Sequence, residues 1–426
     1  RRIDYTLTDA DIDIWAQQCI LAVENETFDF STKVKEVFTQ SGKRRVIYHY
    51  PKLSVENFIC HYLKKRLDKV FKIEYASRSK IINLLFNTIP ALKNMNDFVI
   101  IRADFKSFFD SVLSRFVYEK YVLPSLLPRG DKDILEKYID EYKYCYAGLC
   151  LSNGMTEIVC RDFDKKLKAR LTSYGVFFYE RYVDDMLIML NSYVSQDEII
   201  DIINTTISEI FGTCPVRLST SPGKFSYISR RGLLVFQKFN FLGYEFFINE
   251  FNGNISFQYG ITEKKRSRYS NIIERAFAQY AVNHDEELLR QRIKIFSSRV
   301  VIARQLMGTS FDWLTKGVIA NYNELRNYTG YLHRDTKEFL ENLYYILLRK
   351  YHLKRPYFIP RKCNEESMYN LFSNMKRNRT LLFEENIGIP KEVLLAWMLK
   401  IDASYSSRGK DYYRIVIDYL EKIKIE

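Results

Sequence analysis

Two apolar runs of strand length lie next to aspartates, and this pattern constrains the fold of the chain more than any other feature. Residues 98–101 form a continuous apolar run that leads into Asp104. Residues 186–190 form a second run directly after Asp184 and Asp185, and residues 176–179 before them are also strand-like. Apolar runs of this length are typical of buried strands. The pattern therefore predicts a strand that ends near Asp104 and a β-hairpin that carries Asp184 and Asp185 near its tip.

These three carboxylates indicate a site for a divalent cation. A carboxylate costs free energy when it is buried without a partner, and adjacent aspartates repel each other. Mg²⁺ prefers oxygen ligands and usually keeps water or substrate phosphate in its shell, so a few carboxylates on strands form a site that a nucleotide completes. Two ions about 3.5–4 Å apart would stabilise the attacking 3′ oxygen and the leaving pyrophosphate. The simpler alternative is an ordinary hairpin with a solvated acidic turn.

Composition narrows the classes of partner. The chain has 65 Lys and Arg against 52 Asp and Glu, a net charge of +13, which fits a polyanion binder, a solubility device or a protein that binds anionic membranes. Its seven cysteines show no CxxC pair, which argues against a zinc ladder or a disulfide framework. No charged segment followed by an apolar run opens the sequence, and no run is long enough to span a bilayer. We therefore expect a cytoplasmic protein without a membrane partner.

The remaining sequence is mostly of helical period. Helices are predicted over residues 58–71, 156–171 and 197–211, and further strands over residues 46–50, 233–236 and 239–246. After about residue 262 the period is helical to the end. These patterns predict an α+β chain in three parts, residues 1–96, 97–261 and 262–426.

The order of short motifs resembles that of the reverse transcriptase palm over about residues 40–250. Its most specific element is Tyr182-Val183-Asp184-Asp185. The other matching positions, in chain order, are Asp104, Phe109, Gly148-Leu149, Thr156 and Phe241-Leu242-Gly243. The resemblance implies a right-hand polymerase fold: N-terminal helices and fingers in residues 1–96, an antiparallel palm sheet interleaved with the fingers in residues 97–261, and an all-α thumb and C-terminal extension in residues 262–426.

The resemblance also implies roles for individual residues. Two Mg²⁺ ions, replaceable by Mn²⁺, would be held by Asp104, Asp184, Asp185 and the backbone of Phe105. The residues implied to contact the nucleotide are Lys43, Arg45, Arg78, Phe105, Phe109 and Thr156, with Phe109 as a steric gate against the 2′-hydroxyl. Lys224 matches the lysine that protonates pyrophosphate, and Phe241, Leu242 and Gly243 match the primer grip.

Several of these roles have a simpler structural alternative. Phe109 could be a core aromatic residue, and Lys43 and Arg45 could belong to an exposed basic turn. Lys224 could be an ordinary loop lysine, and Gly243 could mark a kink in a strand.

One motif departs from the family, and the departure favours a restricted template, a short repeated product or untemplated addition over ordinary processive copying. Where reverse transcriptases have G-L-P-Q-G-x-x-x-S, this chain has Gly148-Leu149-Cys150-Leu151-Ser152-Asn153-Gly154-Met155-Thr156. The long helical C-terminal part, rich in Tyr, Lys and Arg, resembles that of the bacterial defence-associated, abortive-infection-like reverse transcriptases. Among them, residues 77–82, 102–109 and 179–185 resemble those of the smaller enzyme of systems that encode two.

This resemblance implies an RNA-directed DNA polymerase of antiviral defence that uses dNTPs. Its partners would be a noncoding RNA template, a DNA product strand, and a second reverse transcriptase or further copies of itself. The alternatives are an untemplated or protein-primed DNA polymerase, a catalytically silent RNA-binding scaffold and a metal nuclease.

Overall fold

The computed structural model of the chain describes residues 9–40, 43–232, 236–305, 311–363 and 365–424. The chain divides into two compact units between residues 233 and 234. Both units combine helices with mainly antiparallel sheets, which confirms the α+β class. No helix in the described ranges has both the length and the apolar character that crossing a bilayer requires.

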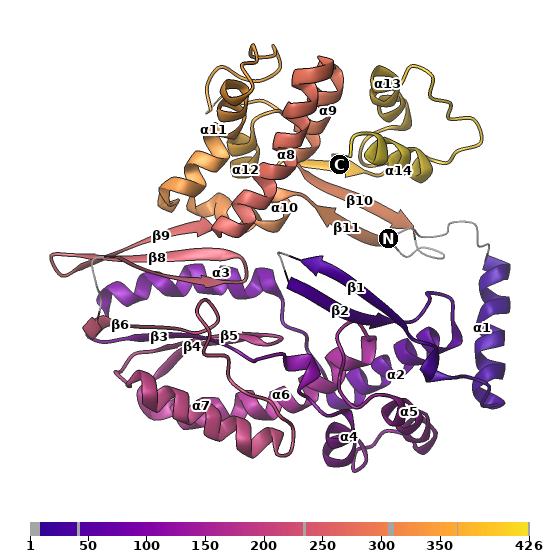
Figure 1. The fold of residues 1–426 in the computed structure, drawn as a ribbon, viewed down its shortest axis with the longest axis vertical. Coiled ribbons are helices and arrows are strands. Elements are labelled where there is room, and N and C mark those ends of the chain that lie inside the picture. Colours follow the sequence, from indigo (N-terminus) through magenta and orange to yellow (C-terminus); the bar gives the residue numbers. More distant parts are fainter. Residues whose placement is uncertain (1–8, 41–42, 233–235, 306–310, 364, 425–426) are drawn as a thin grey trace. The chain divides into compact units, whose positions relative to one another are not determined.

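The first unit carries the residues predicted to bind metal (Figure 1). Its helices are α1 (Asp9–Glu24), α2 (Val55–Phe71), α3 (Arg78–Thr88), α4 (Ser114–Val117), α5 (Arg129–Glu141), α6 (Cys150–Leu171) and α7 (Gln196–Phe211). Its strands are β1 (Val34–Gln40), β2 (Lys43–His49), β3 (Val99–Asp104), β4 (Val176–Tyr182), β5 (Asp185–Leu190) and β6 (Ser226–Ser229).

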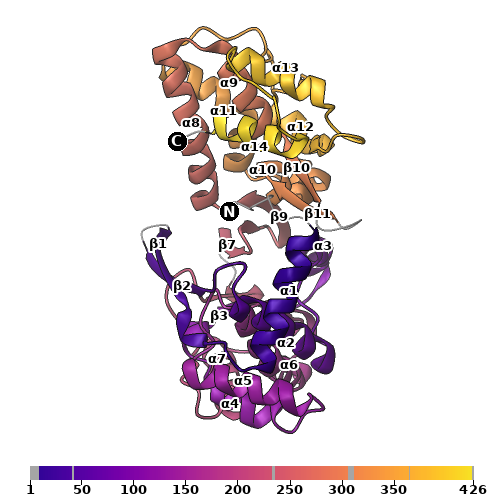
Figure 2. The same cartoon turned by 90° about the vertical axis from the view of Figure 1, so that its right-hand side faces the viewer.

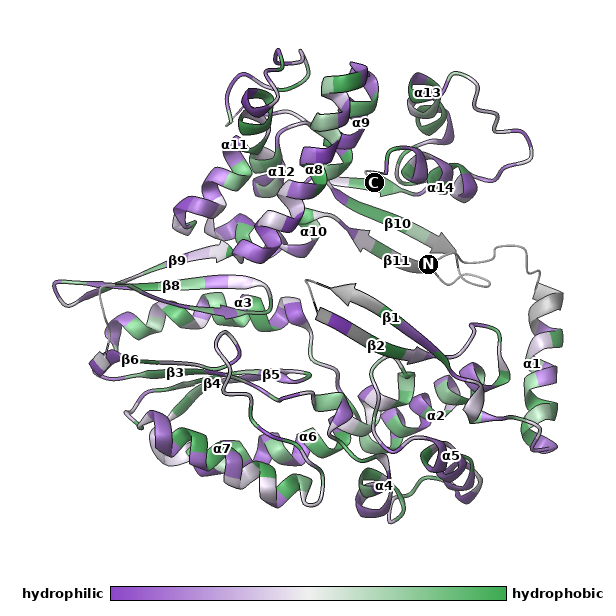
Figure 3. Ribbon diagram, in the orientation of Figure 1, coloured by the Kyte–Doolittle hydropathy of each residue, from purple (hydrophilic) through white to green (hydrophobic). Residues whose placement is uncertain are grey.

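A four-stranded antiparallel sheet with the order β4-β5-β3-β6 forms the centre of this unit. Alternate side chains of a strand point to opposite faces. The odd-numbered residues of β3, from Val99 to Ala103, belong to the apolar core with α6 and α7, which cover that face (Figure 1). The even-numbered residues of β3, Arg102 and Asp104 among them, therefore lie on the other face of the sheet. Figure 3 shows that the strands of this sheet are otherwise mostly apolar.

Strands β1 and β2 form a separate antiparallel hairpin, in which the strand predicted over residues 46–50 is confirmed. The amide of Tyr48 donates to the carbonyl oxygen of Ala147 at 3.0 Å, which joins the hairpin to the segment before α6. Gly148 follows with a φ of +98°, and a Cβ there would lie 2.5 Å from the Tyr48 carbonyl oxygen. Only glycine satisfies both demands without strain.

The second unit contains more strand than we predicted (Figure 2). Its helices are α8 (Glu263–Asn283), α9 (Glu286–Phe296), α10 (Val318–Asn321), α11 (Arg334–Lys350), α12 (Leu371–Arg377), α13 (Lys391–Ile401) and α14 (Tyr412–Lys422). Its strands are β7 (Phe236–Phe241), β8 (Tyr244–Phe251), β9 (Asn254–Ile261), β10 (Arg299–Gln305), β11 (Phe311–Lys316) and β12 (Thr380–Phe383).

The prediction of an all-α region after residue 261 is wrong. Strand β10 pairs antiparallel with β11 and parallel with β12, so a three-stranded sheet lies among these helices. Val300, Val301 and Ile302 are β-branched and suit a strand, and the sheet packs on α13 and α14. A run of this length is too short to show a clear period, and the partner strand β12 lies far along the chain, so the local pattern could not predict β10.

The expected boundaries at residues 96 and 261 also differ from the observed division. Residues before and after 96 share one core in the first unit. The sheet β7-β8-β9 belongs instead to the second unit, because the Ile261 amide donates to the Thr336 hydroxyl at 2.9 Å and the ring of Phe247 stacks on His333 with 3.9 Å between centroids. Residues 233–235, part of a predicted strand, lie outside the described residues.

Candidate active site

The sheet register of the first unit brings the three predicted metal ligands together. Asp104, the last residue of β3, pairs directly with Asp185, the first residue of β5. The amide of Phe105 donates to the carbonyl oxygen of Asp184 at 3.2 Å, which fixes the hairpin tip beside the end of β3. The Asp104 carbonyl in turn accepts from the Ser219 amide at 2.8 Å. Backbone pairing on both sides therefore holds these carboxylates.

The tip of the β4–β5 hairpin is strained and clamped. Val183 has a φ of +61°, a left-handed conformation that is unusual for a β-branched residue. Arg181 of β4 is buried; its guanidinium donates to the Val183 carbonyl oxygen at 2.7 Å and to the carboxylates of Glu157 and Asp164 on α6 at 2.7–3.1 Å. This network links the hairpin tip to the longest helix of the unit.

Two cations contact the carboxylates. The guanidinium of Arg102 bonds both oxygens of Asp185, Nε at 2.9 Å and Nη2 at 3.1 Å, and Nη1 donates to the Gly223 carbonyl. The ammonium of Lys224 bonds Oδ2 of Asp104. The Asp104 side chain is 4% exposed and that of Lys224 is 44% exposed, so the lysine reaches inward from the surface. Asp184 forms no ion pair with any residue that the structure describes.

Burial perturbs the carboxyl groups at the hairpin. Desolvation raises the pKa of Asp184 to about 6, and the nearby charge of Asp104 adds to the rise. Desolvation also raises the pKa of Asp185, while the hydrogen bonds and charge of Arg102 oppose that rise. Asp184 is half-buried, and a partly desolvated carboxyl without a cation partner is the group that gains most from a bound metal.

The donor set fits a metal that substrate completes, but not a preformed cage. Among the described residues, no group of three or more His, Cys, Asp or Glu side chains is arranged to hold a metal ion. Mg²⁺ commonly takes one or two carboxylates and fills its remaining positions with water and substrate phosphates. Asp104 and Asp184 supply such a pair, whereas the oxygens of Asp185 are bonded to Arg102.

The structure separates the aromatic residues predicted to contact the nucleotide. The Phe105 ring is fully buried against Phe108 and Phe211, so only its backbone can face the site. The Phe109 ring is half-buried on the short 3-10 helix η3 (Phe108–Asp110), directly after the left-handed Ser107. The role of Phe109 as a steric gate stays a prediction.

Thr156 lies inside α6, and its hydroxyl donates to the carbonyl oxygens of Ser152 and Asn153 at 2.9 and 3.1 Å. The side chain is buried, so in this structure the hydroxyl bonds its own helix, and the contact with a nucleotide stays a prediction. The helix begins at Cys150, six residues before the predicted start.

The predicted basic nucleotide contacts are described only in part. Lys43 and Arg45 belong to β2, but their side chains lie outside the described part of the structure. Arg78 is the first residue of α3, where the Ser77 hydroxyl accepts from the Lys80 amide as the N-cap.

The predicted primer-grip residues form a tight turn in the second unit. Leu242 and Gly243 join β7 to β8 with φ values of +49° and +87°, which matches the two positive values of a type I′ hairpin turn. Phe241 before the turn is buried. Gly243 is thus required by the turn itself, and only Leu242 and Gly243 are accessible at its tip.

Arg102 and Arg181 are the residues of the site that sequence reasoning missed. Both are charged residues inside strand-like runs, two and three positions before aspartates of the site. A charged side chain in a buried strand needs a charged partner, and that requirement is the signal that could have identified them.

No family model matches this sequence, and no curated protein matches it. Among solved structures, the chain is similar to telomerase from Candida albicans, solved with the TWJ fragment of telomeric RNA. The identity is 12% and the TM-score 0.40, over 97% of this chain and 68% of that one. It is also similar to telomerase from Candida tropicalis with the same kind of RNA fragment, at 13% identity and a TM-score of 0.38 over the same shares of both chains.

Proposed function

We propose that this chain is an RNA-directed DNA polymerase, a reverse transcriptase that adds deoxynucleotides with the aid of two divalent cations. The observation that carries the proposal is the pairing of Asp104 with Asp185 across β3 and β5, with Asp184 at the adjoining hairpin tip. Three carboxylates that backbone pairing holds at one end of a sheet suit a metal-assisted displacement at phosphorus.

The residues of the chain have distinct tasks in this proposal. Asp104 and Asp184 would hold Mg²⁺, which supplies charge stabilisation for the attacking and leaving oxygens. Arg181 orients the hairpin tip that carries Asp184. Lys224 lies at the carboxylates and can approach a phosphate, where a fixed cation offsets developing negative charge.

The proposal is tested by extension of a labelled DNA primer on an RNA template. Asp104→Asn and Asp184→Asn should each lower incorporation by at least about a thousandfold, since both remove a metal ligand. Asp201→Asn, an exposed carboxylate on α7, is the matched control and should retain full activity. Undiminished extension by both site variants would overturn the proposal, and shortening of the labelled strand would indicate a nuclease instead.

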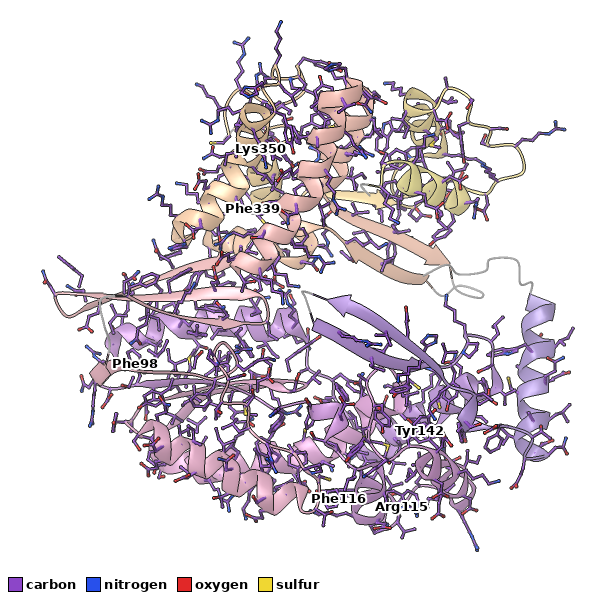
Figure 4. The ribbon with its side chains drawn as sticks, viewed as in Figure 1. Phe98, Arg115, Phe116, Tyr142, Phe339 and Lys350 are labelled. Atoms are coloured by element: carbon purple, nitrogen blue, oxygen red, sulfur yellow. The ribbon has the colours of Figure 1, made fainter. Side chains whose placement is uncertain are left out.

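A basic and aromatic segment of the second unit supports an RNA or primer partner. Residues 342–364 contain no Asp or Glu but six Lys and Arg. All six side chains are exposed: Arg349, Lys350, Lys354, Arg355, Arg361 and Lys362. Tyr357 lies among them and is 73% exposed; Figure 4 labels Lys350 at the end of α11. Exposed cations beside an exposed ring suit phosphates and an unstacked base.

Binding of single-stranded RNA, followed by fluorescence anisotropy over a range of salt concentrations, tests this surface. Tyr357→Ala should weaken binding about tenfold through the lost stacking. Lys354→Ala should weaken it and reduce the slope of log affinity against log salt by about 0.7 for each lost phosphate contact. Lys400→Ala, an exposed lysine on α13, is the control. If Tyr357→Ala and Lys354→Ala both leave the RNA affinity unchanged, the RNA binds at another surface.

We further propose a bacterial antiviral defence role with a dedicated noncoding RNA as template. The support is the sequence resemblance of the long C-terminal part and of residues 77–82, 102–109 and 179–185. Sequencing the nucleic acid that copurifies, together with the product made from each dNTP, tests the template. A product with no counterpart in the bound RNA would favour the untemplated or protein-primed alternative.

A further inference from the structure

The carboxylates of the candidate active site already carry two positive charges that belong to the chain itself. Asp185 is bonded through both oxygens to Arg102, and Asp104 is bonded through Oδ2 to Lys224. Three acidic side chains and two basic ones therefore occupy one end of the sheet. A divalent cation that enters this site must compete with these charges for the same oxygens.

The two built-in cations differ in how firmly they are held. Arg102 lies on β3, its side chain is 10% exposed, and its guanidinium is fixed on two sides by Asp185 and the Gly223 carbonyl. Its Nη2 also lies 4.0 Å from Oδ2 of Asp104. Lys224 lies on a loop, extends from solvent and makes one contact with the site. A lysine ammonium on a flexible stem is a point charge that moves readily, whereas a bidentate arginine is not.

We propose that Lys224 is a tethered counter-ion that occupies the metal position on Asp104 until a divalent cation displaces it, while Arg102 permanently withdraws Asp185 from the set of metal ligands. The inference rests on the proposed function, because it concerns the same site. It assigns metal binding to Asp104 and Asp184 alone. It also explains why a nucleotide would strengthen metal binding by two carboxylates, since its phosphates supply the negative charge that Lys224 and Arg102 offset.

Binding of Mn²⁺ to the full chain without nucleotide tests the first part, measured from the electron paramagnetic resonance signal of free Mn²⁺. Lys224→Met should raise Mn²⁺ affinity about tenfold, because the metal no longer competes with the ammonium. Lys165→Met removes the same charge from an exposed position on α6 and should change the affinity less than about threefold. Lys224→Arg retains the charge and should keep the affinity low. Equal Mn²⁺ affinity in Lys224→Met and the unaltered chain would overturn this part.

The second part predicts unequal contributions from the adjacent aspartates. Asp184→Asn should lower Mn²⁺ affinity about tenfold or more, while Asp185→Asn should change it less than about threefold. Because Asp185→Asn leaves Arg102 without its counter-charge, the double variant Arg102→Gln/Asp185→Asn is measured beside it. A large loss of affinity in both the single and the double variant would show that Asp185 is a ligand and refute the assignment.

Failure of this inference and failure of the proposed function give different results. If Asp104→Asn and Asp184→Asn leave Mn²⁺ binding unchanged, the metal site itself is wrong. If they abolish binding while Lys224→Met has no effect, the site is correct and only the counter-ion role of Lys224 is refuted.

Discussion

Arg181 provides the sharpest test of how the fold holds the tip of the β4–β5 hairpin. Its guanidinium bridges Glu157, Asp164 and the Val183 carbonyl, and its side chain is 6% exposed. Replacing it with methionine fills much of the same volume but leaves two carboxylates without a cation. Breaking a buried ion pair by removing one partner costs about 3–5 kcal/mol, so we expect a loss of that size in the free energy of unfolding.

Arg115 is a matched control within the same unit. It also pairs with two carboxylates, Glu136 at 3.0 Å and Asp140, but its side chain is 42% exposed (labelled in Figure 4). Water screens such a surface pair, so Arg115→Met should cost less than about 1 kcal/mol. The difference between the two variants reports mainly the effect of burial, since the charge, the residue type and the number of carboxylate partners are alike.

Urea unfolding measures the free energies, and amide hydrogen exchange over residues 176–190 reports whether the hairpin opens locally. Arg181→Met should accelerate exchange there, because Val183 in its left-handed conformation loses the bond that holds its carbonyl. Arg181→Lys should recover only part of the loss, since one ammonium cannot bridge all three partners. Equal costs for the Arg181→Met and Arg115→Met variants, or unchanged exchange at the hairpin, would refute the clamp.

Three further predictions concern single groups. Phe109→Ala should raise the use of ribonucleotides relative to deoxynucleotides in primer extension, and an unchanged ratio would exclude the gate. In metal-free protein, the contribution of Asp184 to the free energy of unfolding should fall by about 2 kcal/mol as pH rises from about 4 to about 6, because folded Asp184 keeps its proton to about 6 and the unfolded group loses it near 3.8. Asp184→Asn should remove this part of the pH dependence in urea unfolding. Burial lowers the pKa of Lys294 from 10.5 to about 7, so the unfolded protein binds more protons than the folded protein between these pH values. Lys294→Met should therefore raise the free energy of unfolding at pH 7 by about 3 kcal/mol, after about 2 kcal/mol is subtracted for the lost contact between the ammonium and the Trp397 ring. A lower free energy of unfolding in this variant would contradict the prediction.

The sequence predicted those parts of the fold that local pattern alone determines. The β4–β5 hairpin, α7 with Gly212 at its end, and β2 all lie where the pattern placed them, because each has a clear period and a turn or cap at its boundary. The register that sets Asp104 opposite Asp185 could not be derived in this way. It depends on which strands pair, and β3 lies far from β5 along the chain.

The strands that were missed depend on tertiary context. Strand β6 is four residues long and is completed by pairing with β3. Strand β12 pairs in parallel with β10, a non-local pairing that leaves no local signal. Residues 239–246 were predicted as one strand, but Leu242 and Gly243 turn the chain between β7 and β8. A glycine within an apolar run is compatible with either a kink or a turn, and the partner strand decides between them.

The segment 148–156 shows which of its residues the fold itself requires. Gly148 is retained where φ is positive and the Tyr48 carbonyl oxygen approaches, so its role is to seat the β1–β2 hairpin against the start of α6. The residues after it form the first turns of a regular helix, in which Leu151 packs in the core and Thr156 bonds its own backbone. Asn153 is the exposed polar side chain of the first turn. In the polymerase proposed above, Asn153 and the adjoining hairpin would be the groups of this segment able to support a templating base, and a restricted template would arise there.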